Sequence, residues 1–239
     1  MIFIASLLDT RTIADVNIWT KPLKFIYAFG IHFATILLVL PLLQKKYFDN
    51  KVVLYSSIIA AYSLVLEVIY IAIQALRGRA SHFNDLTQLE NLMYGLMGVG
   101  AVLGIIGSFV IGYYILKYAR ENISFGVKYG VGVGLMLGSA LTFIVAGYLG
   151  GNGSHFIDKS FQNIALLPIM GWSTIYGDLR VPHFFATHTM QFLPLVGLLS
   201  LYINRKYEKT FVYTATAFCV LIVTFTFWQA LNNIPFITL

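Results

Sequence analysis

The feature that most constrains this chain is the recurrence of long apolar runs along its whole length. A helix needs about 20 apolar residues, at ~1.5 Å per residue, to cross the hydrocarbon core of a bilayer. Six such runs lie at 22–43, 52–76, 89–117, 125–149, 182–203 and 209–231. Only 11% of the residues are charged, against about 25% in a soluble domain. The sequence therefore predicts an all-α polytopic membrane bundle of six transmembrane helices, in a single domain covering residues 1–239.

Two segments fall outside these spans. Residues 1–21 begin with MIFIASLL, which is too short to cross a bilayer, so we expect an N-terminal interfacial segment there. Residues 150–181 form a long loop between the fourth and fifth helices, and loops of that length are often functional. Its apolar stretch FQNIALLPIMGW contains a proline. We expect a re-entrant or interfacial piece, with a seventh span over 161–176 as the alternative.

The orientation follows from the distribution of Lys and Arg, because cytoplasmic loops carry an excess of both. The side with the loops 44–51, 117–128 and 204–209 holds nine of the sixteen, and the opposite side holds seven. This distribution predicts that both termini are extracytoplasmic. The basic residues form short clusters between spans rather than one basic module, so we expect the lipid bilayer as partner and no nucleic acid.

Small residues recur at helical spacing in the third and fourth spans. Gly130, Gly134 and Gly138 follow one another every four residues, and Gly100 and Gly104 do the same. Such rows let two membrane helices approach closely where lipid offers no hydrophobic drive for association. We expect these two helices to be a packed scaffold.

Polar residues inside spans point to the functional site, because ionisable groups in hydrocarbon are costly and are mostly functional. Glu67 lies ten residues before Arg77, which is ~15 Å below the end of the second helix. It belongs to a polar stripe on one face of that helix. The stripe consists of Ser63, Glu67, Tyr70 and Gln74.

The first and fifth spans bring polar groups to the same half of the membrane. His32 lies ten residues after Pro22, and His183, His188 and Gln191 follow the start of the fifth helix. Donor-rich segments lie above this layer, namely KPLKF, RGRASHFND, GDLRVPHF and the loop around His155. All five histidines fall in this half. The sequence predicts a polar vestibule that leads down to Glu67, His32, His188 and Gln191.

Three segments carry a family resemblance: KPLKF, LEVIYIAIQALRGRASHFN, and GWSTIYGDLRVPHFFATHTMQFLPLVG. With their KPxKF, RGxxSHFN and GDLRxPHFxxxHxxQ patterns, they resemble a family of bacterial multipass membrane proteins. The resemblance covers most of the chain. It implies the membrane fold, a location in the bacterial cytoplasmic (inner) membrane and the importance of the motif residues, but no mechanism comes with it.

Redox chemistry with haem b or a transition metal is the first functional hypothesis, because neutral imidazoles on different helices can ligate iron or a metal. For haem, the expected ligands are His32 and His188. Basic side chains would hold its propionates or a quinone headgroup, and the candidates are Lys24, Arg77, Arg79 and Arg180. For a metal nearer the surface, the expected ligands are His82, His155, His183 and Asp178.

Two other functions stay open. The first is a proton- or ion-coupled transporter or channel for a small solute, in which Glu67 binds the proton or cation. The second is a lipid-modifying membrane enzyme with Glu67, His188 and Gln191 as its reacting groups. The sequence contains no HExxH, GxSxG or P-loop pattern, which disfavours zinc proteases, serine hydrolases and nucleotide enzymes.

Overall fold

The computed structural model describes residues 2–13, 16–84, 86–157 and 165–238. Within these ranges, six helices are long and apolar enough to cross a membrane, which confirms the predicted all-α bundle. They are α2 (Thr20–Val39), α4 (Lys51–Leu76), α5 (Gln88–Tyr118), α6 (Phe125–Asn152), α7 (Arg180–Ile203) and α8 (Glu208–Leu231). Each predicted span boundary lies within four residues of the observed one.

Polar caps set where three of these helices begin. The side chain of Asn50 accepts from the Val52 amide at the start of α4. Thr87 does the same for Glu90 at the start of α5, and Ser124 does so for α6. Each cap satisfies one of the amides that a helix leaves without an internal partner.

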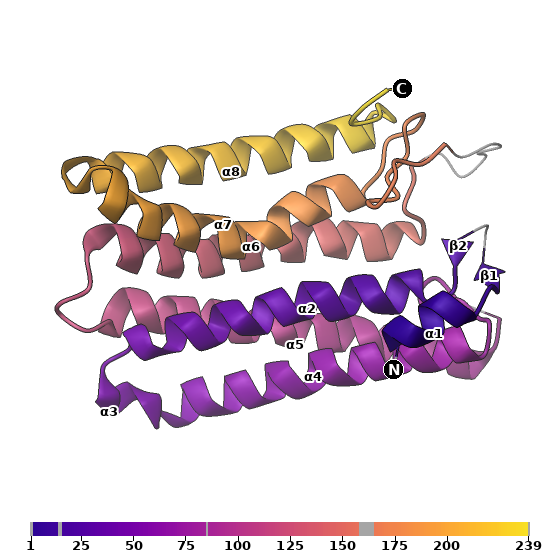
Figure 1. Ribbon diagram of the computed structural model, residues 1–239, viewed down its shortest axis with the longest axis horizontal. Helices are drawn as coiled ribbons and strands as arrows, with labels where there is room; N and C mark the ends of the chain where they lie inside the picture. Colours follow the sequence, from indigo (N-terminus) through magenta and orange to yellow (C-terminus); the bar gives the residue numbers. More distant parts are fainter. Residues whose placement is uncertain (1, 14–15, 85, 158–164, 239) are drawn as a thin grey trace.

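Short elements lie at the two ends of the bundle. They are α1 (Ile2–Leu8), the antiparallel strands β1 (Thr12–Ile13) and β2 (Val16–Asn17), η1 (Leu40–Leu42), α3 (Lys45–Phe48) and η2 (Arg205–Tyr207). We call the end with α1, the strands and the segments after α4 and α6 the histidine end. The opposite end, with η1, α3 and η2, is the lysine end (Figure 1).

The helices α4 to α8 pack as a series in which each contacts the next along the chain. Helix α2 lies over this series, against α4 and in contact with α7 (Figure 1). It is held loosely, since Pro22 and Val39 are the buried residues of this fully described helix. The bundle therefore has a firm body, α4 to α8, and one lightly packed helix.

The expected close approach of glycine-rich faces is present between α6 and α7. A Cβ placed on Gly130 would lie 2.6 Å from the Leu193 carbonyl oxygen. One on Gly138 would lie 2.5 Å from Cγ of Met190. Gly104 likewise faces Leu64 of α4 at 2.9 Å. The row of small residues thus lets the backbones of α6 and α7 touch, as membrane helices without side-chain bulk can.

The lysine end is closed by an apolar core. Leu43, Ile115 and Leu135 there have no exposed surface. The backbone around them is also paired, because Gln44 N–H donates to the Tyr118 carbonyl and Leu43 bridges Ala119. As far as the structure describes this core, its buried residues are all apolar.

The described part of the loop between α6 and α7 does not span a membrane. Residues 165–176 form turns and a bridge between Leu166 and Ser173, and Ile169 is 90% exposed. A seventh span over 161–176 is therefore wrong for these residues, while 161–164 lie outside the described ranges. Helix α1 exposes Phe3, Leu7 and Leu8, a pattern that fits the predicted interfacial segment.

Candidate functional site

Glu67 lies on the inner face of α4 and is buried, with 7% of its surface exposed. Its Oε1 is 3.8 Å from Nε2 of His82. Its Oε2 has no hydrogen-bond partner among the described residues. Burying a carboxylate without partners is costly, so this position predicts that a proton or a bound guest satisfies Glu67.

His82 comes from the segment between α4 and α5. Its Nδ1 is 3.1 Å from the Ser81 hydroxyl. This contact is compatible with the neutral tautomer that carries its hydrogen on Nε2, facing Glu67. The pKa of His82 lies well below its usual range, because burial disfavours the charged ring and the positive charge of Lys21 adds to that effect. We call Glu67 and His82 the acid–histidine pair.

The segment that carries His82 is fixed by Glu90, at the start of α5. The Glu90 carboxylate accepts from Arg79 at 2.8 Å and from Gln74 at 3.4 Å. It also accepts from the Thr87 hydroxyl at 3.1 Å, and a guanidinium nitrogen of Arg77 is 3.6 Å away. Arg77 and Arg79, which the sequence suggests as cofactor-binding residues, are therefore engaged by Glu90.

Sequence reasoning missed Glu90, although a signal for it exists. Thr87 and Glu90 have the T-x-x-E spacing of a capping box, in which the acid lies at the third helical position. In the structure, Glu90 is only 2% exposed and gathers the surrounding donors. It acts on the site indirectly, by holding the segment that positions His82.

Helix α7 supplies the opposite wall. Nδ1 of His183 and Oε1 of Gln191 are shielded from solvent and lack a hydrogen-bond partner within the described part of the chain. His188 packs against the Phe184 ring, with 4.3 Å between ring centroids. The His183 ring lies near enough to His82 to contribute to the lowered pKa of His82. The structure thus brings the acid–histidine pair and His183 together.

His155, from the segment after α6, completes the histidine group. Its ring packs on Phe83 with 5.0 Å between centroids, and its carbonyl accepts from the Leu179 amide. Burial and the neighbouring Arg180 lower the pKa of His155 to about 4. Both histidines outside the helices are therefore neutral at pH 7.

Basic side chains surround the top of this group. Lys24 donates to the Met170 carbonyl at 3.0 Å. Lys21 is close enough to His82 and His155 to lower the pKa of both. Arg180 is bound to Asp178 through three contacts, the shortest being 2.6 Å between Nη2 and Oδ2. The rim is positive, and Lys21 is its innermost described member.

The predicted metal ligands do not form a metal centre in the described residues. Asp178 is committed to Arg180 and to the Ser173 amide. No group of three or more His, Cys, Asp or Glu side chains in the part that the structure describes is arranged to hold a metal ion. His82, His155 and His183 are neighbours, but the carboxylate expected to join them is already bound to Arg180.

The two predicted haem ligands have separate partners. Nε2 of His32, the atom that would ligate iron, is 3.0 Å from the Ser108 hydroxyl of α5. His188 contacts the Phe184 ring. No contact in the described chain favours the haem hypothesis, which stays a prediction.

The fold and this site define a polytopic α-helical membrane protein with an intramembrane acid–histidine pair beneath a basic rim. Comparison of the chain with protein-family models, with curated proteins and with solved structures found no match. The resemblance to a family of bacterial multipass membrane proteins therefore stays a prediction. Function must be argued from the site itself.

Proposed function

We propose that this protein is a proton-coupled transporter of a small anionic solute. The observation that carries the proposal is the acid–histidine pair, with Glu67 Oε1 3.8 Å from His82 Nε2 and Glu67 Oε2 unpaired within the described chain. A separation of 3.8 Å is too long for a hydrogen bond. A proton on Glu67 would neutralise the buried carboxylate, and a guest between the two groups could bond to both. Intramembrane acids of this kind commonly serve proton relays.

The unpaired atoms define the chemistry of the guest. Glu67 Oε2 is an acceptor that needs a donor, and His183 Nδ1 can donate or accept. The basic rim of Lys21, Lys24 and Arg180 attracts negative charge. A small carboxylate that also carries hydroxyl or amino donors satisfies both requirements, so hydroxycarboxylates and amino acids are the favoured solute classes.

Helix α2 supports a transport role because it is the lightly packed wall of the site. Its buried residues are Pro22 and Val39, near its two ends, and a Cβ on Gly30 would meet nothing within 4 Å. A helix held at its ends can move relative to α4 and α7 at little cost in packing. In alternating access, one part of the helix bundle moves relative to the rest around the binding site, and α2 is suited to be that part.

The test is solute-driven proton movement in liposomes. The purified chain is reconstituted with a pH-sensitive dye inside, and a panel of hydroxycarboxylates and amino acids is added under a proton gradient. We expect at least one solute to drive proton influx, and Glu67→Gln to abolish it. Glu121→Gln, an exposed acid at the lysine end, is the matched control and should behave as the unchanged protein. Influx that persists in Glu67→Gln, or a panel in which no solute drives it, would contradict the proposal.

A further inference from the structure

An apolar groove of about 400 Å³ lies between α4 and α5 at the lysine end, far from the acid–histidine pair. Its walls are formed by Val52, Tyr55, Ile59, Leu103, Ile106 and Val110. Nearly all of the lining surface is apolar, and Lys51 closes one end. Since both helices are membrane spans, the groove opens toward the bilayer.

Gly107 creates the groove. A Cβ there would lie 2.5 Å from Cβ of Ala60 and 2.9 Å from the Ser56 carbonyl oxygen. The two backbones therefore meet at this point, and the larger side chains on either side stand clear of a floor made by Ser56 and Gly107.

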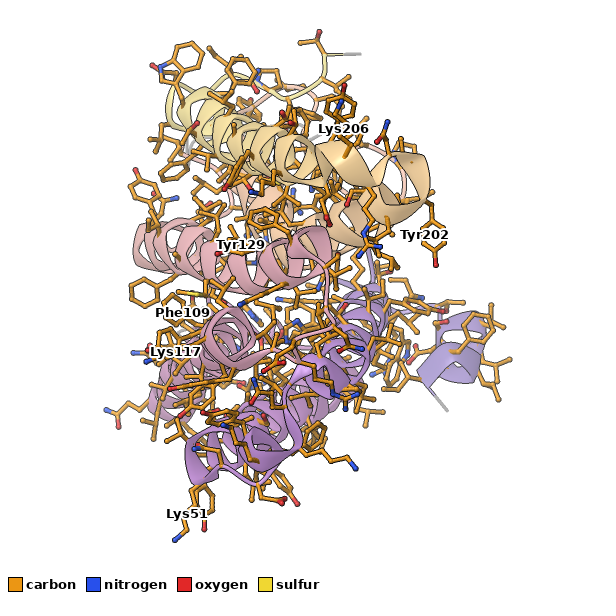
Figure 2. All side chains as sticks on the ribbon, turned by 90° about the vertical axis from the view of Figure 1, so that its left-hand side faces the viewer. Lys51, Phe109, Lys117, Tyr129, Tyr202 and Lys206 are labelled. Atoms are coloured by element: carbon orange, nitrogen blue, oxygen red, sulfur yellow. The ribbon has the colours of Figure 1, made fainter. Side chains whose placement is uncertain are left out.

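The charge at this end is strongly positive. The lysine end carries nine Lys and Arg residues and three acids, Asp49, Glu121 and Glu208, so its formal charge of 9 − 3 = +6 equals that of the whole chain. The remaining seven basic and seven acidic residues of the sequence cancel, so the rest of the chain is formally neutral. Figure 2, viewed from the lysine end, shows Lys51 projecting from one edge of the bundle and Lys206 at the opposite edge. A headgroup beside Lys51 thus meets a positive field.

We propose that this groove binds one acyl chain of an anionic phospholipid, whose phosphate pairs with the Lys51 ammonium group. The apolar walls match the acyl chain, and Lys51 lies at the first helical position of α4, at the level where a span leaves the hydrocarbon. Basic residues at this level attract anionic lipids. The binding site is independent of the proposed transport, because the groove shares no residue with the acid–histidine pair.

The test uses Tyr55→Trp as a reporter on the groove wall. Tyr55 is 57% exposed, so tryptophan fits there without disturbing the core. The variant is reconstituted in vesicles of brominated phosphatidylglycerol or brominated phosphatidylcholine, and quenching is compared with that of the unchanged chain, whose tryptophans are Trp19, Trp172 and Trp228. We expect the anionic lipid to bind beside the reporter about five-fold more tightly, the effect of one basic residue near the surface.

Two charge variants separate the outcomes. Lys51→Gln in the reporter background should remove the preference for the anionic lipid. Lys206→Gln removes the same charge from the opposite edge of the same end and should leave the preference intact. Equal quenching by both lipids, or an unchanged preference in Lys51→Gln, would overturn the proposal. If neither lipid quenches the reporter and the chain runs as a dimer, a second copy covers the groove, which also overturns it.

Discussion

Nε2 of His82 lies 3.8 Å from Oε1 of Glu67, although the two residues come from different elements and Glu67 is buried in the middle of a membrane span. A neutral imidazole and a buried carboxyl at this distance can share one proton once either side chain moves. Their separation couples the protonation of Glu67 to the position of the segment after α4. In the proposed transporter, proton binding and solute binding would therefore compete for the same atoms.

Because the pair acts as a unit, the effects of its two members on transport should not add. Glu67→Gln and His82→Asn should each reduce solute-driven proton influx strongly. The double variant should be no worse than the more severe single one, as with residues that share one function. The measurement is the initial rate of influx in liposomes for all four proteins. Fully multiplicative losses would show that the two residues act separately.

The two histidines outside the helices should make the fold sensitive to acid. Between pH 6.5 and about 4, His155 stays neutral in the folded chain but takes up a proton when unfolded, so the unfolded state binds more protons and the free energy of unfolding falls as the pH falls. His82, with its lowered pKa, acts in the same direction. For His155 the loss is on the order of 1 to 3 kcal/mol.

This pH effect can be measured by thermal unfolding in detergent at pH 7, 6, 5 and 4. His155→Gln should flatten the profile over that window, because glutamine does not titrate. A profile that is equally steep in His155→Gln and in the unchanged chain would assign the acid sensitivity to other groups.

Loss of Glu90 should release the segment that carries His82. Glu90→Ala leaves Arg79 and Gln74 without their shared acceptor, and trypsin cleaves after arginine. We expect cleavage after Arg77 and Arg79 to accelerate about ten-fold or more, since cleavage follows the population of the open segment. Thr87→Val removes both hydrogen bonds between the Thr87 hydroxyl and Glu90 but leaves the contacts of the Glu90 carboxylate with Arg77 and Arg79 in place, so it should have a smaller effect. Equal cleavage of Glu90→Ala and the unchanged chain would argue against this positioning role.

The glycine contact between α6 and α7 should tolerate no added carbon. Gly130→Ala places a methyl group 2.6 Å from the Leu193 carbonyl oxygen and 3.0 Å from Cα of Gly197. Both neighbours are backbone atoms, which cannot relieve the clash by a change of rotamer. We expect a loss of about 1 to 3 kcal/mol in stability, as in other overpacked sites. Gly147→Ala, in the same helix with nothing within 4 Å of its new methyl group, is the control. It should be neutral or slightly stabilising, and thermal unfolding of both variants provides the comparison.

His32 should be dispensable for stability. Ser108 also donates to the Gly104 carbonyl at 3.2 Å, so it keeps a partner when His32 is lost. His32→Leu should reduce the free energy of unfolding by less than about 1 kcal/mol, the usual scale of a polar contact between membrane helices.

An absorption spectrum of the protein expressed with haem supplied tests the other hypothesis for His32, that it ligates haem. A Soret band that disappears in both His32→Leu and His188→Leu would favour the haem reading over transport.

The spans could be predicted from the sequence because bilayer thickness alone fixes the length of an apolar run. The importance of Glu67 was also predictable, because a single acid in the middle of a span is costly to bury and such acids are mostly functional. The partner of Glu67 was not, because His82 reaches it through a segment whose path depends on Glu90. The same holds for Arg77 and Arg79, whose side chains could equally have faced a ligand. These contacts depend on which helices pack against one another, and the pattern of hydrophobic residues does not specify that packing.

The loose packing of α2 divides the molecule into two parts with different tolerances. The body from α4 to α8 contains most of the buried core and carries Glu67, His82 and His183, while the buried residues of α2 are only Pro22 and Val39. Substitutions along α2 can therefore alter how readily the site opens without endangering the assembly of the rest. If the proposed transport is correct, substitutions in α2 can change the transport rate while the stability of the other five helices stays the same.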